Sequence, residues 1–119
     1  MRKTNYSKYR SKKVVVDGIE FASKKEARRY QELKLLERAG AIKALELQPI
    51  FLLQDKFRYD NKGYRKIEYI ADFKYIDKDG NVVVEDVKSK GTATSVYKIK
   101  KKLFLKKYGD KYKFFENYM

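Results

Sequence analysis

The sequence predicts an α/β fold whose core runs in the order α-β-β-β-α-β after an N-terminal β-hairpin. Two segments have helical periodicity and each is followed by a glycine, and the first also begins with a capping signal. Short segments rich in β-branched and aromatic residues, separated by turn residues, indicate the strands. With 119 residues, of which 43% are hydrophobic, we expect one domain over residues 14–119 and a basic flexible arm over residues 1–13.

The first predicted helix begins at Ser23 and ends at Gly40. Its start, Ser23-Lys24-Lys25-Glu26, has the sequence of a capping box, in which the two side chains satisfy free backbone N–H groups. Helical spacing predicts a buried arc that consists of Tyr30, Leu33 and Leu36. Glu26 lies inside this arc, so its side chain is expected to point inward.

The second predicted helix spans Thr94–Tyr108 and is closed by Gly109. Its predicted apolar arc consists of Val96, Ile99 and Leu103. Lys98 and Lys102 lie away from this arc and are expected to face solvent or DNA. Lys100 lies closer to the arc, where a lysine either approaches a site or extends its ammonium to the surface.

The strands are predicted from alternation and from the turns between them. The core strands are predicted at Glu46–Leu53, Ile67–Ile76, Val82–Lys88 and Tyr112–Glu116. Val14–Phe21 is predicted to form the hairpin around Asp17-Gly18, either as an ornament that packs on the first helix or as a dimer edge. Arg58–Lys66 is predicted to be a basic polar loop whose tyrosines are available for stacking.

Acidic residues interrupt two of the predicted core strands. If the turn between these strands is centred on Asp79, Asp72 stands opposite Asp86, and Ile70 stands opposite Lys88. A register shifted by one residue places Glu85 opposite Asp72 instead. We favour Asp86, because Glu85 and Lys88 point to opposite faces of a regular strand.

Clustered carboxylates in a core require a partner, since an unpaired buried charge costs several kcal/mol, and a metal ion is the natural one. The chain has neither histidine nor cysteine. These absences exclude histidine-dependent nucleases, thiolate sites and histidine-ligated zinc. Oxygen ligands favour Mg²⁺ or Mn²⁺ as the cofactor.

The pattern of Ala71-Asp72-Phe73 followed by Asp86-Val87-Lys88 resembles the PD-(D/E)XK nuclease superfamily, although Ala71 stands where that pattern has proline. The order of the predicted elements is also similar to the minimal core of that superfamily. A closer resemblance, to small phage-encoded members, rests on Phe21–Ala27, Ala71-Asp72-Phe73 and Val84–Lys88. The resemblance implies a restriction-endonuclease-like core, with a mixed central sheet flanked by helices.

The resemblance also implies a catalytic set and its roles. Asp72 and Asp86, the backbone carbonyl of Val87 and Glu26 are the implied metal ligands. Lys88 is expected to orient or activate the attacking water, and cleavage is expected to leave a 5′-phosphate and a 3′-hydroxyl. Glu26 has an alternative role, because the capping box alone explains a glutamate at that position.

The net charge of +14 predicts a polyanionic partner, with nucleic acid favoured over an anionic membrane surface or an acidic protein. Residues 1–13 contain six basic and no acidic residues, and the second helix contributes further lysines. The predicted DNA-binding residues are Arg2, Lys3, Lys8, Arg10, Lys12, Lys13, Lys98 and Lys102.

The sequence thus predicts a Mg²⁺-dependent DNA endonuclease of phage recombination or DNA processing, with branched DNA such as Holliday junctions as the favoured substrate. The alternatives are a nicking or restriction-like enzyme on linear duplex, and a non-catalytic basic DNA-binding protein. Two cuts require two sites, so we expect a homodimer. We expect no nucleotide cofactor, no membrane span and a cytoplasmic location, in the host cell if the protein is phage-encoded.

Overall fold

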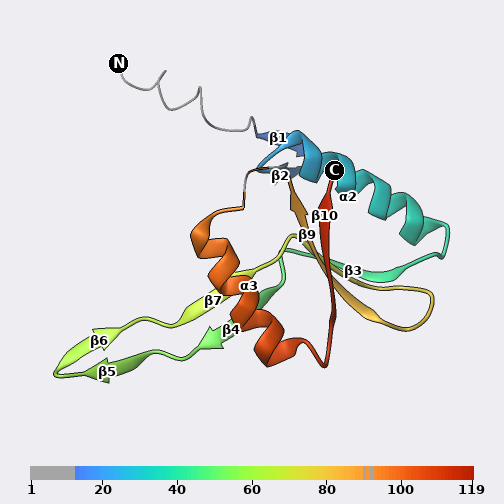
Figure 1. Ribbon diagram of the computed structural model, residues 1–119. Coiled ribbons are helices and arrows are strands. Elements are labelled where there is room, and N and C mark those ends of the chain that lie inside the picture. The colour runs from blue at the N-terminus through green and yellow to red at the C-terminus, as the bar shows by residue number, and fades with distance from the viewer. Residues whose placement is uncertain (1–12, 90, 92) are drawn as a thin grey trace, which may run out of the picture.

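The computed structural model describes residues 13–89, 91 and 93–119, which form two helices and ten strands (Figure 1). The helices are α2 (Lys24–Arg38) and α3 (Ser95–Tyr108). The strands are β1 (Val14–Val16), β2 (Ile19–Phe21), β3 (Lys43–Leu47), β4 (Ile50–Gln54), β5 (Phe57–Tyr59), β6 (Lys62–Tyr64), β7 (Ile67–Ile70), β8 (Phe73–Ile76), β9 (Val82–Lys88) and β10 (Lys113–Tyr118).

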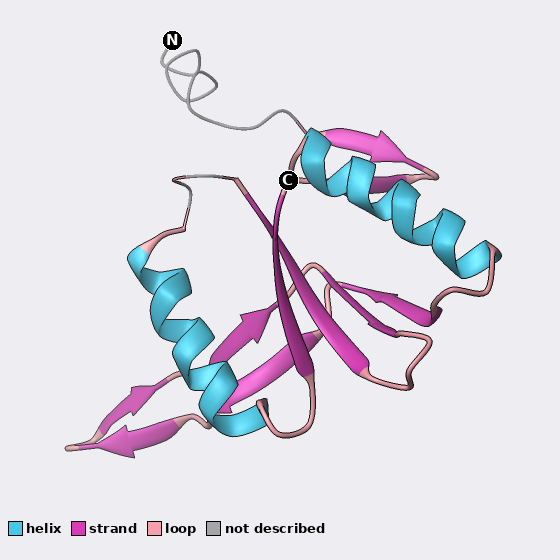
Figure 2. Ribbon diagram, turned by 45° about the vertical axis from the view of Figure 1, so that its right-hand side comes forward, coloured by secondary structure: helices cyan, strands magenta, loops and turns pink. Residues whose placement is uncertain are grey.

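The result is a mixed α/β fold built on one four-stranded sheet and several two-stranded ones. The larger sheet has the order β10-β9-β8-β3, in which β10 runs parallel to β9 and the other neighbours are antiparallel. α2 packs on β3 and β9, whereas α3 packs on β4 and β7, so the two helices lie on different sides of the molecule (Figure 2). No helix in the described ranges is long and apolar enough to cross a membrane.

Both predicted helices are confirmed, and a side-chain hydroxyl caps the start of each. The Ser23 hydroxyl accepts from the Glu26 N–H at 3.2 Å at the start of α2, and the Thr94 hydroxyl accepts from the Tyr97 N–H at 3.1 Å at the start of α3. At the end of α2, Gly40 adopts φ 81°. Its N–H and that of the next residue bond back to the last turn, a Schellman arrangement that only a residue with positive φ allows.

The predicted buried arc of the second helix is wrong. Val96, Ile99 and Leu103 are exposed, and the fully buried residue of α3 is Phe104. The helix instead turns its tyrosines inward, since Tyr97 and Tyr108 pack with Phe104 against β4 and β7. In α2 the prediction holds for Tyr30 and Leu33, whereas Leu36 is exposed.

Two predicted core strands are broken, and they break side by side. The segment Glu46–Leu53 divides at Gln48-Pro49, because proline has no N–H for a ladder and Gln48 adopts φ 49°. The segment Ile67–Ile76 divides at Ala71-Asp72. Backbone bonds from Ala71 N to Pro49 O and from Gln48 N to Asp72 O join the two breaks. Ile70 therefore pairs with Ile50 in a different sheet, and the expected pair of Ile70 with Lys88 is wrong.

The segment predicted as the loop Arg58–Lys66 forms most of the short hairpin β5–β6, which reaches away from the rest of the chain (Figure 1). Its turn residues Asp60 and Asn61 have φ 49° and 63°, the positive values that a tight type I′ hairpin turn requires. The predicted N-terminal hairpin is confirmed as β1–β2, with positive φ at Asp17 and Gly18. It packs on α2, as Tyr30 Oη donates to the Asp17 carboxylate at 2.9 Å.

The core is divided between the two faces of the sheet. One cluster, under α2, includes Phe73, Tyr75 and Val83. The other, under α3, includes Tyr69, Val84 and Phe104. Successive residues of β9 therefore serve different cores, and this alternation decides where its two acidic residues point.

Candidate active site

The candidate site forms where β8 begins, directly after the break in the long strand. The ladder pairs Phe73 with Glu85, which confirms the predicted register, since the same register carries position 72 opposite position 86. The Asp72 N–H donates to Glu85 O at 3.1 Å. The Asp72 carboxylate accepts from the Val87 N–H at 2.7 Å. The break thus fixes Asp72 at the end of β9 without continuing the ladder.

Asp86 and Lys88 lie on the face of β9 that Asp72 approaches. The Asp86 carboxylate accepts a hydrogen bond from Tyr69 Oη and forms an ion pair with Lys88 Nζ at 2.8 Å. The Lys88 ammonium also lies over the ring of Tyr97, 3.8 Å from the centroid, a cation–π contact. Asp86 is 4% exposed, whereas the Lys88 side chain is 19% exposed. The ammonium is therefore held in place and remains accessible.

These residues line a cleft of about 330 Å³ between the first turn of α2, the end of β9 and the start of α3. Glu26 belongs to it, so the Ser23 hydroxyl caps the helix while the Glu26 carboxyl faces Asp72. Lys100 also lines the cleft, which is one of the two positions expected for this lysine. The complete lining is Glu26, Tyr69, Ile70, Asp72, Asp86, Val87, Lys88, Thr94, Val96, Tyr97 and Lys100.

The cleft brings three carboxyl groups together in a partly buried position. Burial and the charges of Asp86 and Glu26 raise the pKa of Asp72 to about 8, against the opposing hydrogen bond from Val87. Burial also raises the pKa of Glu26, with a smaller opposing contribution from its hydrogen bond to Asp72. Lys88 is the cation that stands among these three carboxyl groups and lowers the pKa values of Asp72 and Glu26. Lys100 is a second lysine in the lining, so three carboxyl groups face two ammonium groups, and the site favours a further positive charge.

Glu85 occupies the opposite face of β9 and takes no part in the cleft. Its carboxylate is fully buried and accepts from Arg29 Nε at 2.6 Å and Nη2 at 3.1 Å. Tyr75 Oη at 2.7 Å and Asn117 Nδ2 at 3.0 Å complete the set of donors. Burial opposes the charge of Arg29, but the bonds and charge of Glu85 outweigh it and raise the Arg29 pKa. The alternative register, with Glu85 opposite Asp72, is wrong.

The donor set fits a hard cation that keeps some of its own water. Within residues 13–89, 91 and 93–119, no group of three acidic, histidine or cysteine side chains forms a cage around one point. Asp72 and Asp86 are neighbouring carboxyl groups, and Glu26 is hydrogen-bonded to Asp72. The Val87 carbonyl points to the Asp72 side of β9, as its N–H does. Mg²⁺ is typically bound by one or two carboxylates together with water and phosphate, so the set suits it.

The predicted DNA-binding residues fall in two groups. Arg2, Lys3, Lys8, Arg10 and Lys12 lie outside the described residues. Lys13, Lys98 and Lys102 are described and exposed, and the last two lie on α3, the helix whose start borders the cleft.

Sequence reasoning missed the residues that hold the site in shape. Tyr69 binds Asp86, and Tyr97 supports Lys88 while donating to Glu116 at 2.5 Å. Lys101 binds the same carboxylate at 2.7 Å. Arg29 was missed as well, since it stands on α2 among many basic residues. The apolar arc predicted for α3 hid the role of Tyr97. Burying Val96, Ile99 and Leu103 would have turned Tyr97 away from the site.

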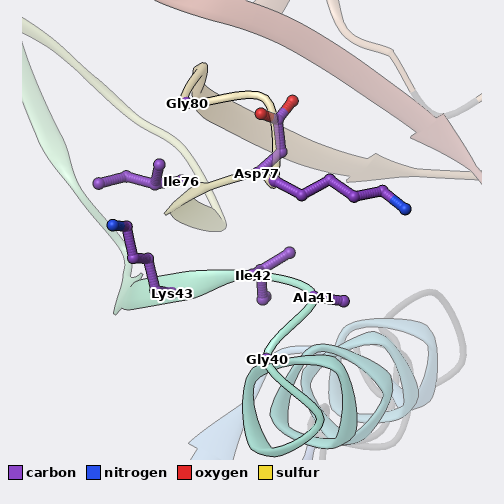
Figure 3. A pocket seen from close by; sticks show the side chains of 8 residues that line it. Gly40, Ala41, Ile42, Lys43, Ile76, Asp77 and Gly80 are labelled. Carbon is purple, nitrogen blue, oxygen red and sulfur yellow. The ribbon is translucent and has the colours of Figure 1, made fainter.

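A second hollow, of about 480 Å³, lies at the other end of the β8–β9 hairpin (Figure 3). Its lining joins the end of α2 and the start of β3, including Lys43, to the turn that holds Asp77 and Lys78. The Asp77 carboxylate already accepts from the N–H groups of Asp79 and Asn81, both at 2.9 Å. These bonds serve the turn itself, so the hollow presents no comparable chemistry.

Comparison with known proteins gives a family without an activity. Residues 6–116 match the family described as "Protein of unknown function (DUF1064)". No curated protein matches the chain. No solved structure matches it. The family match includes every residue that lines the cleft.

Proposed function

The chain belongs to the DUF1064 family, and we propose that this member is a metal-dependent DNA endonuclease with a restriction-endonuclease-like core of the PD-(D/E)XK superfamily. One observation carries the proposal. Asp72, Asp86 and Lys88 meet in one cleft, while the adjacent acidic residue, Glu85, is turned away and neutralised. The parallel arrangement of β10 and β9 in a mixed sheet supports the likeness of the core.

The chain's own residues suit phosphodiester hydrolysis. Asp72, Asp86 and the Val87 carbonyl would hold Mg²⁺ or Mn²⁺, with Glu26 as a further carboxylate beside Asp72. When bound, this cation supplies Lewis-acid activation of the phosphate and of water. Lys88, whose side chain is 19% exposed, would offset the charge that grows on the phosphate oxygens and orient the attacking water. Tyr69 and Tyr97 fix Asp86 and Lys88 in position.

DNA as substrate is supported by charge. The chain carries a net charge of +14, and exposed lysines of α3 lie on the helix that borders the cleft. Lysines that contact phosphates release counterions, so binding is expected to depend steeply on salt. The preference for branched DNA such as a Holliday junction, and a role in phage recombination, rest on analogy with small basic members of the superfamily.

A homodimer is part of this proposal, because a single set of Asp72, Asp86 and Lys88 cuts one strand. β10 is an edge of the four-stranded sheet and carries the exposed rings of Phe115 and Tyr118. An exposed edge strand is open to pairing with a second chain. Sedimentation at micromolar concentration, with and without a four-way junction, tests this. A monomer that only nicks DNA favours the nicking enzyme on linear duplex.

The proposal is tested by cleavage of end-labelled linear, flapped and four-way DNA in Mg²⁺, in Mn²⁺ and in EDTA. We expect cleavage with either cation, none in EDTA, and the fastest cutting of the four-way substrate. The control protein is Asp79→Asn, which removes an exposed carboxylate from the same hairpin. Absence of cleavage from every substrate in both cations contradicts the proposal.

The competing function is a non-catalytic basic DNA-binding protein. The observation that favours it is that each cleft carboxylate already has an internal partner, as Asp86 has Lys88 and Asp72 has the Val87 N–H. Such a protein binds DNA equally well with and without divalent cations and leaves it uncut. The same assay, combined with binding measured in EDTA, separates the two functions.

A further inference from the structure

The β5–β6 hairpin, residues 57–64, is the most exposed ordered segment among the described residues. Every residue from 54 to 66 is exposed. The two strands pair with each other in a sheet of their own. Both ribbon views show them extending beyond the end of β4 and the start of β7 (Figures 1 and 2). The hairpin therefore contributes little to the core, and its sequence is free to serve another purpose.

One face of this hairpin is aromatic. The register pairs Phe57 with Tyr64 and Tyr59 with Lys62, so these four side chains share a face. The rings of Phe57 and Tyr64 are stacked, with centroids 5.0 Å apart and planes at 11°. Lys62 Nζ lies 5.4 Å from the centroid of Tyr64. Tyr59 is 71% exposed.

Arg58 lies on the other face of the hairpin and braces the turn. Arg58 stands opposite Gly63, where a side chain would lie 3.6 Å from the guanidinium. The guanidinium donates to Asn61 O at 2.9 Å, across the turn. Together with the stacked pair and the tight turn, this contact preforms a ribbon that is otherwise too short to be stable alone.

Charge identifies the class of partner. Residues 56–66 contain five basic residues and one acidic residue, Asp60. A second copy of the hairpin would bring two such basic ribbons together, which like-charge repulsion opposes. A polyanion with flat faces satisfies both the rings and the cations, and DNA with unpaired bases has these properties. Bases stack on exposed aromatic side chains when they are not already stacked in a duplex.

From this arrangement we infer that the aromatic face of β5–β6 is a binding site for unpaired DNA bases, centred on Tyr59 and the stacked pair of Phe57 and Tyr64. The hairpin leads through β7 to Asp72, eight residues beyond Tyr64. At about 3.3 Å per residue this separation is at most about 26 Å, less than one turn of duplex DNA. The inference deepens the proposed function and rests on it for the cleaved strand: the hairpin would hold the single-stranded or splayed bases of a branched substrate.

The test uses the absence of tryptophan from the chain. Tyr59→Trp introduces the only tryptophan of the protein at the proposed site, and Leu35→Trp places one at an exposed position of α2, which is 61% exposed. Each full-length protein is titrated in EDTA with an oligothymidylate and with a blunt duplex of equal length. We expect strong quenching of the residue-59 tryptophan by the single strand, weak quenching by the duplex, and little change at residue 35.

Affinity provides a second measurement. Tyr59→Ala is expected to weaken binding of the oligothymidylate roughly 5- to 100-fold, the usual effect of removing one base-stacking ring, and Tyr59→Phe is expected to retain binding. Leu35→Ala, at an exposed position of α2, is the control. Equal quenching or equal loss on duplex and single strand indicates groove binding and overturns the inference. A change of oligomeric state with unchanged DNA affinity also overturns it, in favour of an interface between copies.

The two proposals fail in different ways. If the hairpin variants lose single-strand binding but the unaltered protein cuts no DNA in Mg²⁺ or Mn²⁺, the base-binding site stands and the nuclease does not. If the protein cuts DNA and Tyr59→Ala binds single strands normally, the nuclease stands and the base-binding site does not.

Discussion

The two faces of β9 carry neighbouring buried acids in opposite circumstances. Glu85 faces α2, where Arg29, Tyr75 and Asn117 donate to both of its carboxylate oxygens. Asp86 faces the cleft, where Asp72 and Glu26 add two further carboxyl groups and the basic residues are Lys88 and Lys100. The first face is electrically complete, whereas the second has more carboxyl groups than cations.

This contrast distinguishes a buried acid that stabilises the fold from acids that can bind a ligand. A buried carboxylate with a bidentate arginine and further donors gains nothing from a ligand, and removing it leaves the arginine unpaired. A cluster of carboxyl groups in an open cleft, with one pKa raised to about 8, is the arrangement that cation binding relieves. The following predictions test this difference by altering one face at a time.

The largest effect is expected from Asp86→Asn. The amide keeps the shape of the side chain and its contact with Tyr69 but removes the charge that holds the cation. Because metal assistance is worth several kcal/mol in the transition state, the cleavage rate should fall about 1000-fold or more. Single-turnover cleavage of a labelled junction measures this, with binding in EDTA as the control. A rate within tenfold of the unaltered protein removes Asp86 from the mechanism.

Glu85→Gln is expected to damage stability instead. Breaking the buried pair with Arg29 should lower the free energy of unfolding by about 3 kcal/mol, as measured by urea denaturation. The exposed Glu20→Ala serves as the control and should change the same quantity by less than about 0.5 kcal/mol. Below its melting transition, the Glu85→Gln protein should cut DNA at a normal rate. Lost cleavage in a fully folded Glu85→Gln protein would reverse the assignment of the two faces.

Variants of Glu26 and Ser23, which lie within one helical turn, test metal binding and helix capping separately. Glu26→Gln should reduce cleavage about 10- to 100-fold, in the range seen when a supporting metal-site contact is removed, with little change in stability. Ser23→Ala should lower stability by about 1 kcal/mol through the lost N-cap and leave cleavage unchanged. Cleavage rates and urea midpoints for both variants decide the matter. The opposite pattern assigns Glu26 to the cap alone.

The smallest effect is expected on the exposed face of α3. Lys98→Ala and Lys102→Ala should each reduce the slope of log affinity against log salt by about 0.9, if each lysine contacts one phosphate. Neither variant should change the cleavage rate at saturating protein. Anisotropy titrations at four salt concentrations measure the slope. Binding that does not respond to salt contradicts an electrostatic interface with DNA.

Local signals made much of this arrangement predictable. Ser23, Thr94 and Gly40 define helix ends through their own side chains or lack of one, and Asp77 and Gly80 define the turn that sets the register of β8 and β9. Because the register follows from that turn, the separation of Asp86 from Glu85 was accessible from the sequence.

Tertiary effects account for what the sequence did not predict. Pro49 breaks one strand, but the matching break at Asp72 arises from backbone bonds across to Gln48 and Pro49. The buried face of α3 was misjudged because its tyrosines, which combine a ring with a hydroxyl, replace aliphatic residues as the inward side chains. Tyr97 is therefore both a core residue and the support of Lys88.

The central claim is that the cleft of Asp72 and Asp86, and not the face of Glu85, holds a divalent cation. The most direct measurement is binding of Mn²⁺, followed by loss of its free electron paramagnetic resonance signal in the presence of a duplex oligonucleotide. We predict that the unaltered, Asp79→Asn and Glu85→Gln proteins bind Mn²⁺ beyond the amount taken up by DNA alone, and that Asp86→Asn does not. Equal Mn²⁺ binding by all four proteins would contradict the account.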